Sequence, residues 1–150
     1  MKYAEIAVNK FNNGFNCAQS IMFAFSDTLK AEARTAFKAA TGFGGGMGRK
    51  QEVCGAVTGG VMTLSLLLGR EETDGPEKQE TVFTAVRALL DTFEQKYGTV
   101  ICGRLLGGCD LLTPEGQERF TTEKMKTERC CKYIADVAVF LELIIKKNGR

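Results

Sequence analysis

The sequence predicts a single all-α domain over residues 1–150, a compact bundle of five to seven helices. Apolar residues recur at helical spacing along most of the chain, and no stretch shows the alternating pattern of a strand. With 44% hydrophobic and 25% charged residues, 150 residues suffice for one buried core. A glycine-rich loop precedes a nearly uncharged stretch, which we expect to be the central buried helix.

The N-terminal elements have clear start and stop signals. An opening helix over 2–12 should end at Asn13-Gly14. Asn16 is placed to cap a second helix, with Gln19 three residues later as its capping-box partner. A third helical stretch is expected at about 31–40.

Glycine and proline divide the rest of the chain. Five glycines fall within residues 42–48, where the backbone must adopt unusual dihedral angles or approach a neighbour closely. The central helix is expected at about 54–68, followed by a helix that begins at Pro76 and ends at Gly98. The last helix should span about 124–147. The apolar stripe of the helix from Pro76 comprises Val82, Phe83, Val86, Leu89, Leu90, Phe93 and Tyr97.

Composition excludes several classes of function. The chain has six cysteines and no histidine, so Ser–His and Cys–His catalytic pairs and haem attachment through C-x-x-C-H are absent. The net charge is +2 and no basic stripe carries interleaved aromatics, which argues against nucleic-acid binding. The uncharged run Val53–Gly69 is rich in glycine and closely flanked by charges, so we expect no membrane insertion. The first residues do not resemble a signal peptide, which predicts a cytoplasmic location.

Four cysteines occupy positions from which they could meet. Cys17, Cys54 and Cys102 lie at predicted helix starts, where free N–H groups and the helix dipole favour a thiolate. Helical geometry places Cys130 near the centre of the apolar stripe of the last helix and Cys131 at its flank. We therefore expect these four to share a site, with Cys54 the first choice for a thiolate of lowered pKa.

Cysteine spacing narrows the chemistry without deciding it. No C-x-x-C occurs, which argues against a thioredoxin-like dithiol and a zinc ribbon. Dispersed cysteines can still converge on an iron–sulfur cluster, which requires thiolates but no fixed spacing. Free cysteine is also a common small buried residue, so a purely structural role stays open.

The glycine-rich loop also allows two interpretations. It is not a phosphate-binding P-loop, because Arg49-Lys50-Gln51 follows where G-K-[ST] is required. Its amides could form an anion-binding nest built by Gly44, Gly45 and Gly46 with Arg49. A tight connection that lets the central helix enter the core is the interpretation we prefer.

The order of these motifs resembles the C_GCAxxG_C_C family of redox-active proteins. The matching segments are Gly14–Ala18, Gly44–Gly48, Glu52–Gly59, Cys102–Gly107 and Cys130–Ile134. Members of that family are small helical proteins marked by four cysteines. The resemblance therefore implies a redox role.

Carried over by position, the resemblance assigns the four signature cysteines. They are Cys17, Cys54, Cys102 and Cys130. Cys130 is preferred to Cys131 because the family pattern places a hydrophobic pair three and four residues later, here Tyr133 and Ile134. Cys109 and Cys131 have no clear place in the signature.

Two classes of function follow. The first is a small redox protein that uses these cysteines for thiol–disulfide exchange with a partner protein or small thiol, or for electron transfer through an iron–sulfur cluster that they ligate. The second is a non-catalytic helical module that binds an anion or a partner, for example as a homodimer. The sequence leaves open whether the protein is an enzyme.

Overall fold

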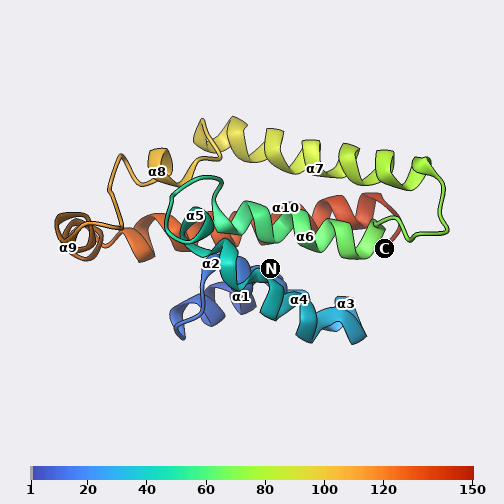
Figure 1. The fold of residues 1–150 in the computed structure, drawn as a ribbon, viewed down its shortest axis with the longest axis horizontal. Coiled ribbons are helices and arrows are strands. Elements are labelled where there is room, and N and C mark those ends of the chain that lie inside the picture. The colour runs from blue at the N-terminus through green and yellow to red at the C-terminus, as the bar shows by residue number, and fades with distance from the viewer. Residues whose placement is uncertain (1) are drawn as a thin grey trace.

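The structure, a computed structural model, describes residues 2–150 and confirms the all-α prediction (Figure 1). No strand occurs among these residues, and a single isolated bridge pairs Val53 with Ile101. The longer helices are α1 (Lys2–Asn12), α2 (Cys17–Ala24), α6 (Gly55–Leu68), α7 (Pro76–Tyr97), α9 (Pro114–Thr122) and α10 (Cys131–Lys147). The short ones are α3 (Ser26–Leu29), α4 (Ala33–Ala39), α5 (Gly44–Met47) and α8 (Cys102–Leu105), with single turns at Lys30–Glu32, Ala40–Phe43 and Lys126–Cys130.

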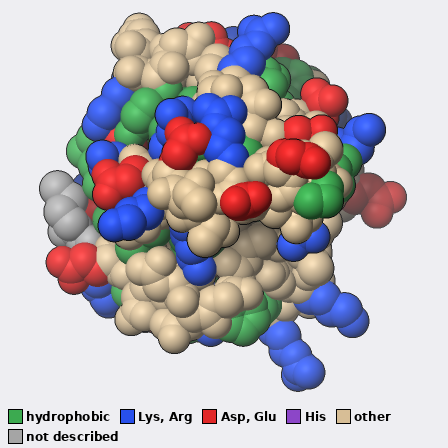
Figure 2. All heavy atoms as spheres, turned by 90° about the vertical axis from the view of Figure 1, so that its left-hand side faces the viewer, with side chains coloured by type: hydrophobic (Ala, Val, Ile, Leu, Met, Phe, Trp, Pro, Cys, Tyr) green, Lys and Arg blue, Asp and Glu red, His purple; other side chains and the backbone are tan. Residues whose placement is uncertain are grey.

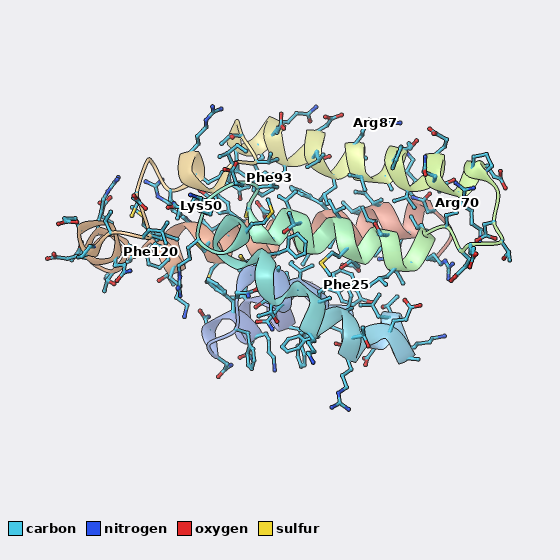
Figure 3. All side chains as sticks on the ribbon, in the orientation of Figure 1. Phe25, Lys50, Arg70, Arg87, Phe93 and Phe120 are labelled. Atoms are coloured by element: carbon cyan, nitrogen blue, oxygen red, sulfur yellow. The ribbon has the colours of Figure 1, made fainter. Side chains whose placement is uncertain are left out.

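The helix α6 is the centre of the bundle, as expected for the uncharged stretch. It packs against α2 on one side and α7 on the other, with α10 beside it, while α1 packs on α2 and α10 (Figure 1). Phe93 points from α7 toward this centre and Phe25 lies on the opposite side of α6 (Figure 3). Both rings are almost fully buried, so apolar burial on two faces of α6 holds the layers together.

Two adjacent glycines allow helices to approach α6 from different directions. A Cβ atom on Gly59 would lie 3.0 Å from the carbonyl oxygen of Ala18 in α2. A Cβ atom on Gly60 would lie 2.7 Å from Leu89 Cδ2 in α7. The small residues of α6 thus serve packing within the chain. No helix in the described residues is long and apolar enough to cross a membrane.

Most of the predicted helix ends are confirmed. The side chain of Asn16 accepts a hydrogen bond from the Gln19 N–H, and the two form the complete capping box. Pro76 is the first residue of α7, and Gly98 ends it with a left-handed φ of 81°. These signals depend only on neighbouring residues, which is why the sequence revealed them.

The structure adds detail to two expected helical stretches and corrects one residue of a third. The stretch expected at about 31–40 is present as the turn Lys30–Glu32, α4 and the turn Ala40–Phe43, and Lys30, with a φ of 56°, separates it from α3. The last helix begins with a π-helical turn, Lys126–Cys130, before α10. Phe83 belongs to no buried stripe, since it is 48% exposed on the outer side of α7. These short breaks raise the number of helical segments above the expected range.

Candidate functional site

Four cysteines from four separate segments line one cavity of about 590 Å³. Cys17 is the first residue of α2, Cys54 caps α6, Cys102 begins α8, and Cys130 ends the π-helical turn. The cavity lies at the end of the bundle where α9 covers it, the end that carries Phe120 in Figure 3. The fold thus brings together side chains that are up to 113 positions apart, the separation 130 − 17.

The isolated bridge brings Cys54 and Cys102 together. The Cys54 N–H donates to the Val100 carbonyl at 2.8 Å, and the Cys102 N–H donates to the Glu52 carbonyl at 2.6 Å. Residues 51–54 and 100–103 therefore run side by side, and each enters a helix directly after the bridge. Two cysteines at helix starts become neighbours through backbone hydrogen bonds alone.

The glycine-rich loop forms the next wall. Between residues 45 and 51, only Lys50 lacks a positive φ, an unusual left-handed run. Only glycine fits at position 46, because a Cβ atom there would lie 2.8 Å from the Cβ of Cys102. The N–H of Gly45 is directed at the Cys17 sulfur and lowers the pKa of that thiol. Strained backbone of this kind is often found at functional sites.

The contact between Gly55 and Cys17 explains why glycine follows Cys54 in the C-G-A element of the sequence. A Cβ atom at this position would overlap the Cys17 Sγ atom. The backbone of α6 is therefore in direct contact with the sulfur of α2, which only glycine permits. Because Gly59 faces Ala18 one turn later, the two glycines hold α2 against α6 at the level of the cavity.

The π-helical turn separates the two adjacent cysteines. Cys130 lines the cavity, whereas Cys131 is buried against α1 and its Sγ donates to Asn12 Oδ1 at 3.6 Å. The two adjacent cysteines thus face different surroundings, Cys130 the cavity and Cys131 the helix α1. Cys109 also lies outside the cavity, where its Sγ donates to the Gly116 carbonyl at 3.0 Å.

Burial raises the pKa of every thiol in the cavity. It raises the pKa of Cys102 and of Cys130 from 9.0 to about 12, with a further contribution from neighbouring cysteine charges. The pKa of Cys54 is also raised well above 9.0, chiefly by burial and then by the charges of Cys17 and Cys102. The expectation of a lowered pKa at Cys54 is therefore wrong. The amides of Ala56 and Val57 do lower it, but removal from water outweighs them.

The cavity lining carries positive charge only. Arg49 and Lys126 line it, and no Asp or Glu among the described residues does. Figure 2 views this end of the molecule and shows acidic and basic side chains intermixed on the surrounding surface. Lys126 was not identified from the sequence, although its position four residues before Cys130 places the two on one helical face.

Several backbone amides of the glycine-rich loop form hydrogen bonds within the loop itself. The loop N–H groups of Gly48, Arg49, Gln51 and Glu52 donate to carbonyls of residues 42, 44, 45 and 46. Of the four residues of the predicted nest, only Arg49 donates its N–H within the loop, and the Gly45 N–H is directed at the Cys17 sulfur.

Within residues 2–150, no three Cys, Asp or Glu side chains are grouped so as to hold a single metal ion.

A comparison with protein families decides the relationship. The model of the family described as "putative redox-active protein (C_GCAxxG_C_C)" matches residues 15–144. This chain belongs to the C_GCAxxG_C_C family. The match begins just before Cys17 and includes all six cysteines, the glycine loop and α6. Every residue that lines the cavity except Phe11 therefore lies within the matched region of this C_GCAxxG_C_C protein. Neither the curated proteins nor the solved structures contain a match.

Proposed function

We propose that this protein is an electron carrier in which Cys17, Cys54, Cys102 and Cys130 hold an iron–sulfur cluster. The observation that carries the proposal is that these four cysteines line one cavity while the other two lie outside it. Four cysteine thiolates are the usual ligand set of such clusters. The family's redox description supports the same class of function.

Charge gives a second line of support. Four thiols whose pKa values are all raised stay protonated at neutral pH, which leaves them poor nucleophiles. A bound metal centre places positive charge next to the sulfurs. This charge stabilises the thiolate form, which burial alone disfavours. The cations Arg49 and Lys126 would offset part of the remaining negative charge of the four ligands.

The size of the group also matters. The cavity has a volume of about 590 Å³ and four cysteines in its lining, so a group larger than a single ion could be held there.

In this proposal the chain supplies position, shielding and hydrogen bonds. The bound cluster would accept and release single electrons. The amides that point at Cys17 and Cys54 donate to the ligand sulfurs, which stabilises negative charge there and raises a reduction potential. The rings of Phe11 and Phe120 reduce the access of water to the sulfurs.

Thiol–disulfide exchange is the second candidate. Cys17 lies close enough to Cys54, Cys102 and Cys130 for its charge to raise the pKa of each. In that reaction one cysteine thiolate attacks the disulfide of a partner protein or small thiol. The partner's second sulfur leaves as a thiolate, and a mixed disulfide remains. Another cavity cysteine then attacks the cavity sulfur of this mixed disulfide, which forms a disulfide within the protein and releases the partner's first sulfur as a thiolate. The raised pKa values count against it, since the thiolate is the attacking form.

The deciding experiment is anaerobic purification followed by iron, acid-labile sulfide and visible absorbance. We expect iron and sulfide in near-equal amounts and a brown protein. The matched pair Cys130→Ser and Cys131→Ser sharpens the test, because only Cys130 lines the cavity. Cys130→Ser should lose or strongly alter the visible spectrum, and Cys131→Ser should keep it.

Other results would favour the alternatives. Absence of iron together with reversible loss of two thiols on oxidation would replace the cluster with a dithiol. Inert thiols without iron would leave the binding module, with an anion, a partner or a second copy as its ligand. A cytoplasmic location is a prediction to be tested by fractionation.

A further inference from the structure

We infer that the outer part of the cavity binds a small organic anion, with a carboxylate, phosphate or sulfonate group held by Arg49 and Lys126 and an apolar body against Phe11 and Phe120. This names the substrate class of the same site and so rests on its proposed redox function. Such a molecule would lie beside the four sulfurs that line the cavity.

The two cations that line the cavity are not neutralised by carboxylates of the described residues. Within residues 2–150, neither Arg49 nor Lys126 forms an ion pair with a carboxylate or donates a side-chain hydrogen bond. The nearby Arg119 and Arg129 differ, since they donate to the carbonyls of Gly107 and Leu105 at 3.1 and 2.9 Å. The unpaired charges thus coincide with the cavity.

The neutral polar groups of the lining are already occupied. Asn16 accepts from the Gln19 N–H and donates to the Thr41 carbonyl. Gln117 donates to the Leu111 carbonyl and Thr121 to the Gln117 carbonyl. A neutral polar ligand would therefore find few free groups, whereas an anion finds two free cations.

The remaining wall is apolar and includes an aromatic partner for one cation. Lys126 Nζ lies 5.1 Å from the centroid of the Phe11 ring, which holds the ammonium at the cavity. Phe120 and Leu111 complete this surface. A volume of about 590 Å³ is that of a typical small-molecule site. An apolar body with one anionic group is complementary to this lining.

The experiment compares two disulfide reagents on the reduced, metal-free protein. 5,5′-Dithiobis(2-nitrobenzoate) carries a carboxylate on each half, and 4,4′-dithiodipyridine is uncharged. In both reactions a cavity thiolate attacks one sulfur, a mixed disulfide forms, and the other half leaves as a thiolate whose absorbance is recorded. We expect Arg49→Gln with Lys126→Gln to lower the ratio of the anionic to the neutral rate by about tenfold at low salt.

The matched control removes the same charge outside the cavity. Lys50→Gln with Arg104→Gln changes two exposed cations that do not line it, and should leave the ratio nearly unchanged. A second measurement distinguishes binding of an anion in the cavity from long-range electrostatic attraction of the reagent. It uses 4-nitrobenzoate, which contains no disulfide and cannot react with the thiols. This anion should protect the wild-type thiols against 4,4′-dithiodipyridine, whereas neutral 4-nitrobenzamide should not.

Three results would overturn the inference. They are an equal fall of the ratio in both double variants, no protection by 4-nitrobenzoate, and equal protection by 4-nitrobenzoate and 4-nitrobenzamide. The iron measurement is independent of this test. Anion selectivity in a protein that binds no iron would remove the cluster and retain the anion site.

Discussion

The two halves of α6 differ in what surrounds them. The first half follows Cys54 and consists of small residues, with a sulfur atom against Gly55 and a left-handed loop beside it. The second half carries Leu64 and Leu67, which are buried in a regular apolar core with Leu141 of α10. One helix thus joins a site that tolerates strain to a core that supplies the stability.

This division predicts that stability and sulfur chemistry can be changed separately. The second half of α6 packs in an apolar core, whereas the cavity beside its first half is lined by four thiols of raised pKa and two cations. Strained segments persist where the surrounding structure determines them. The packing of the core half is what allows the loop at the other end to adopt its dihedral angles.

The largest effect on stability is expected from Leu141→Ala. Leu141 is fully buried, and truncation leaves a cavity that should lower the free energy of unfolding by about 2–5 kcal/mol. Urea denaturation followed by circular dichroism measures this. The reactivity of the cavity thiols in the folded fraction should stay close to wild type, and a large change there would show that the two halves are coupled.

Gly55→Ala should have the largest effect on the site. The new methyl group overlaps the Cys17 sulfur, so α2 and α6 must separate, at a cost of about 1–3 kcal/mol. We expect loss of iron from the anaerobically purified protein. Gly42→Ala is the control, since a Cβ there meets no atom within 4 Å, and it should retain both iron and stability.

Alkaline pH should destabilise the reduced, metal-free protein. The pKa values of Cys102 and Cys130 are about 12 in the folded state against 9.0 for the ordinary thiol, because burial disfavours the thiolate. Between these values the unfolded chain releases protons that the folded chain keeps, so the free energy of unfolding falls as pH rises from about 9 toward 12. Denaturation at a series of pH values measures the slope. A double variant with alanine at both positions should show a shallower one.

The smallest effect is expected from removing a helix cap. Asn16→Ala should cost about 0.5–2 kcal/mol, as should Thr113→Ala, which removes the hydrogen bond to the Gly116 N–H at the start of α9. Only Asn16 adjoins Cys17, so only Asn16→Ala should also change the rate at which that thiol is alkylated. Equal alkylation rates in both variants would show that the cap does not position the sulfur.

Local signals in the sequence were enough to predict most of the helices. The capping box at Asn16, the proline and glycine that bound α7, and the buried α6 are each specified by residues within a turn or two. The four signature cysteines were also identified there, through helix starts and the family pattern. The π-helical turn Lys126–Cys130 was not predicted, because the sequence pattern there does not distinguish it from the start of a regular α-helix.

Tertiary structure decided the environment of the sulfurs. Whether burial or the helix dipole controls the pKa of Cys54 depends on how much water the packed walls exclude, and no local pattern encodes that. The packing of α10 on α1 also decides that Cys131 contacts Asn12 while Cys130 lines the cavity. Local sequence therefore determined which residues form helices and which cysteines begin them. Distances and desolvation between remote segments arise only when the bundle closes, and they alone determine the chemical state of the thiols.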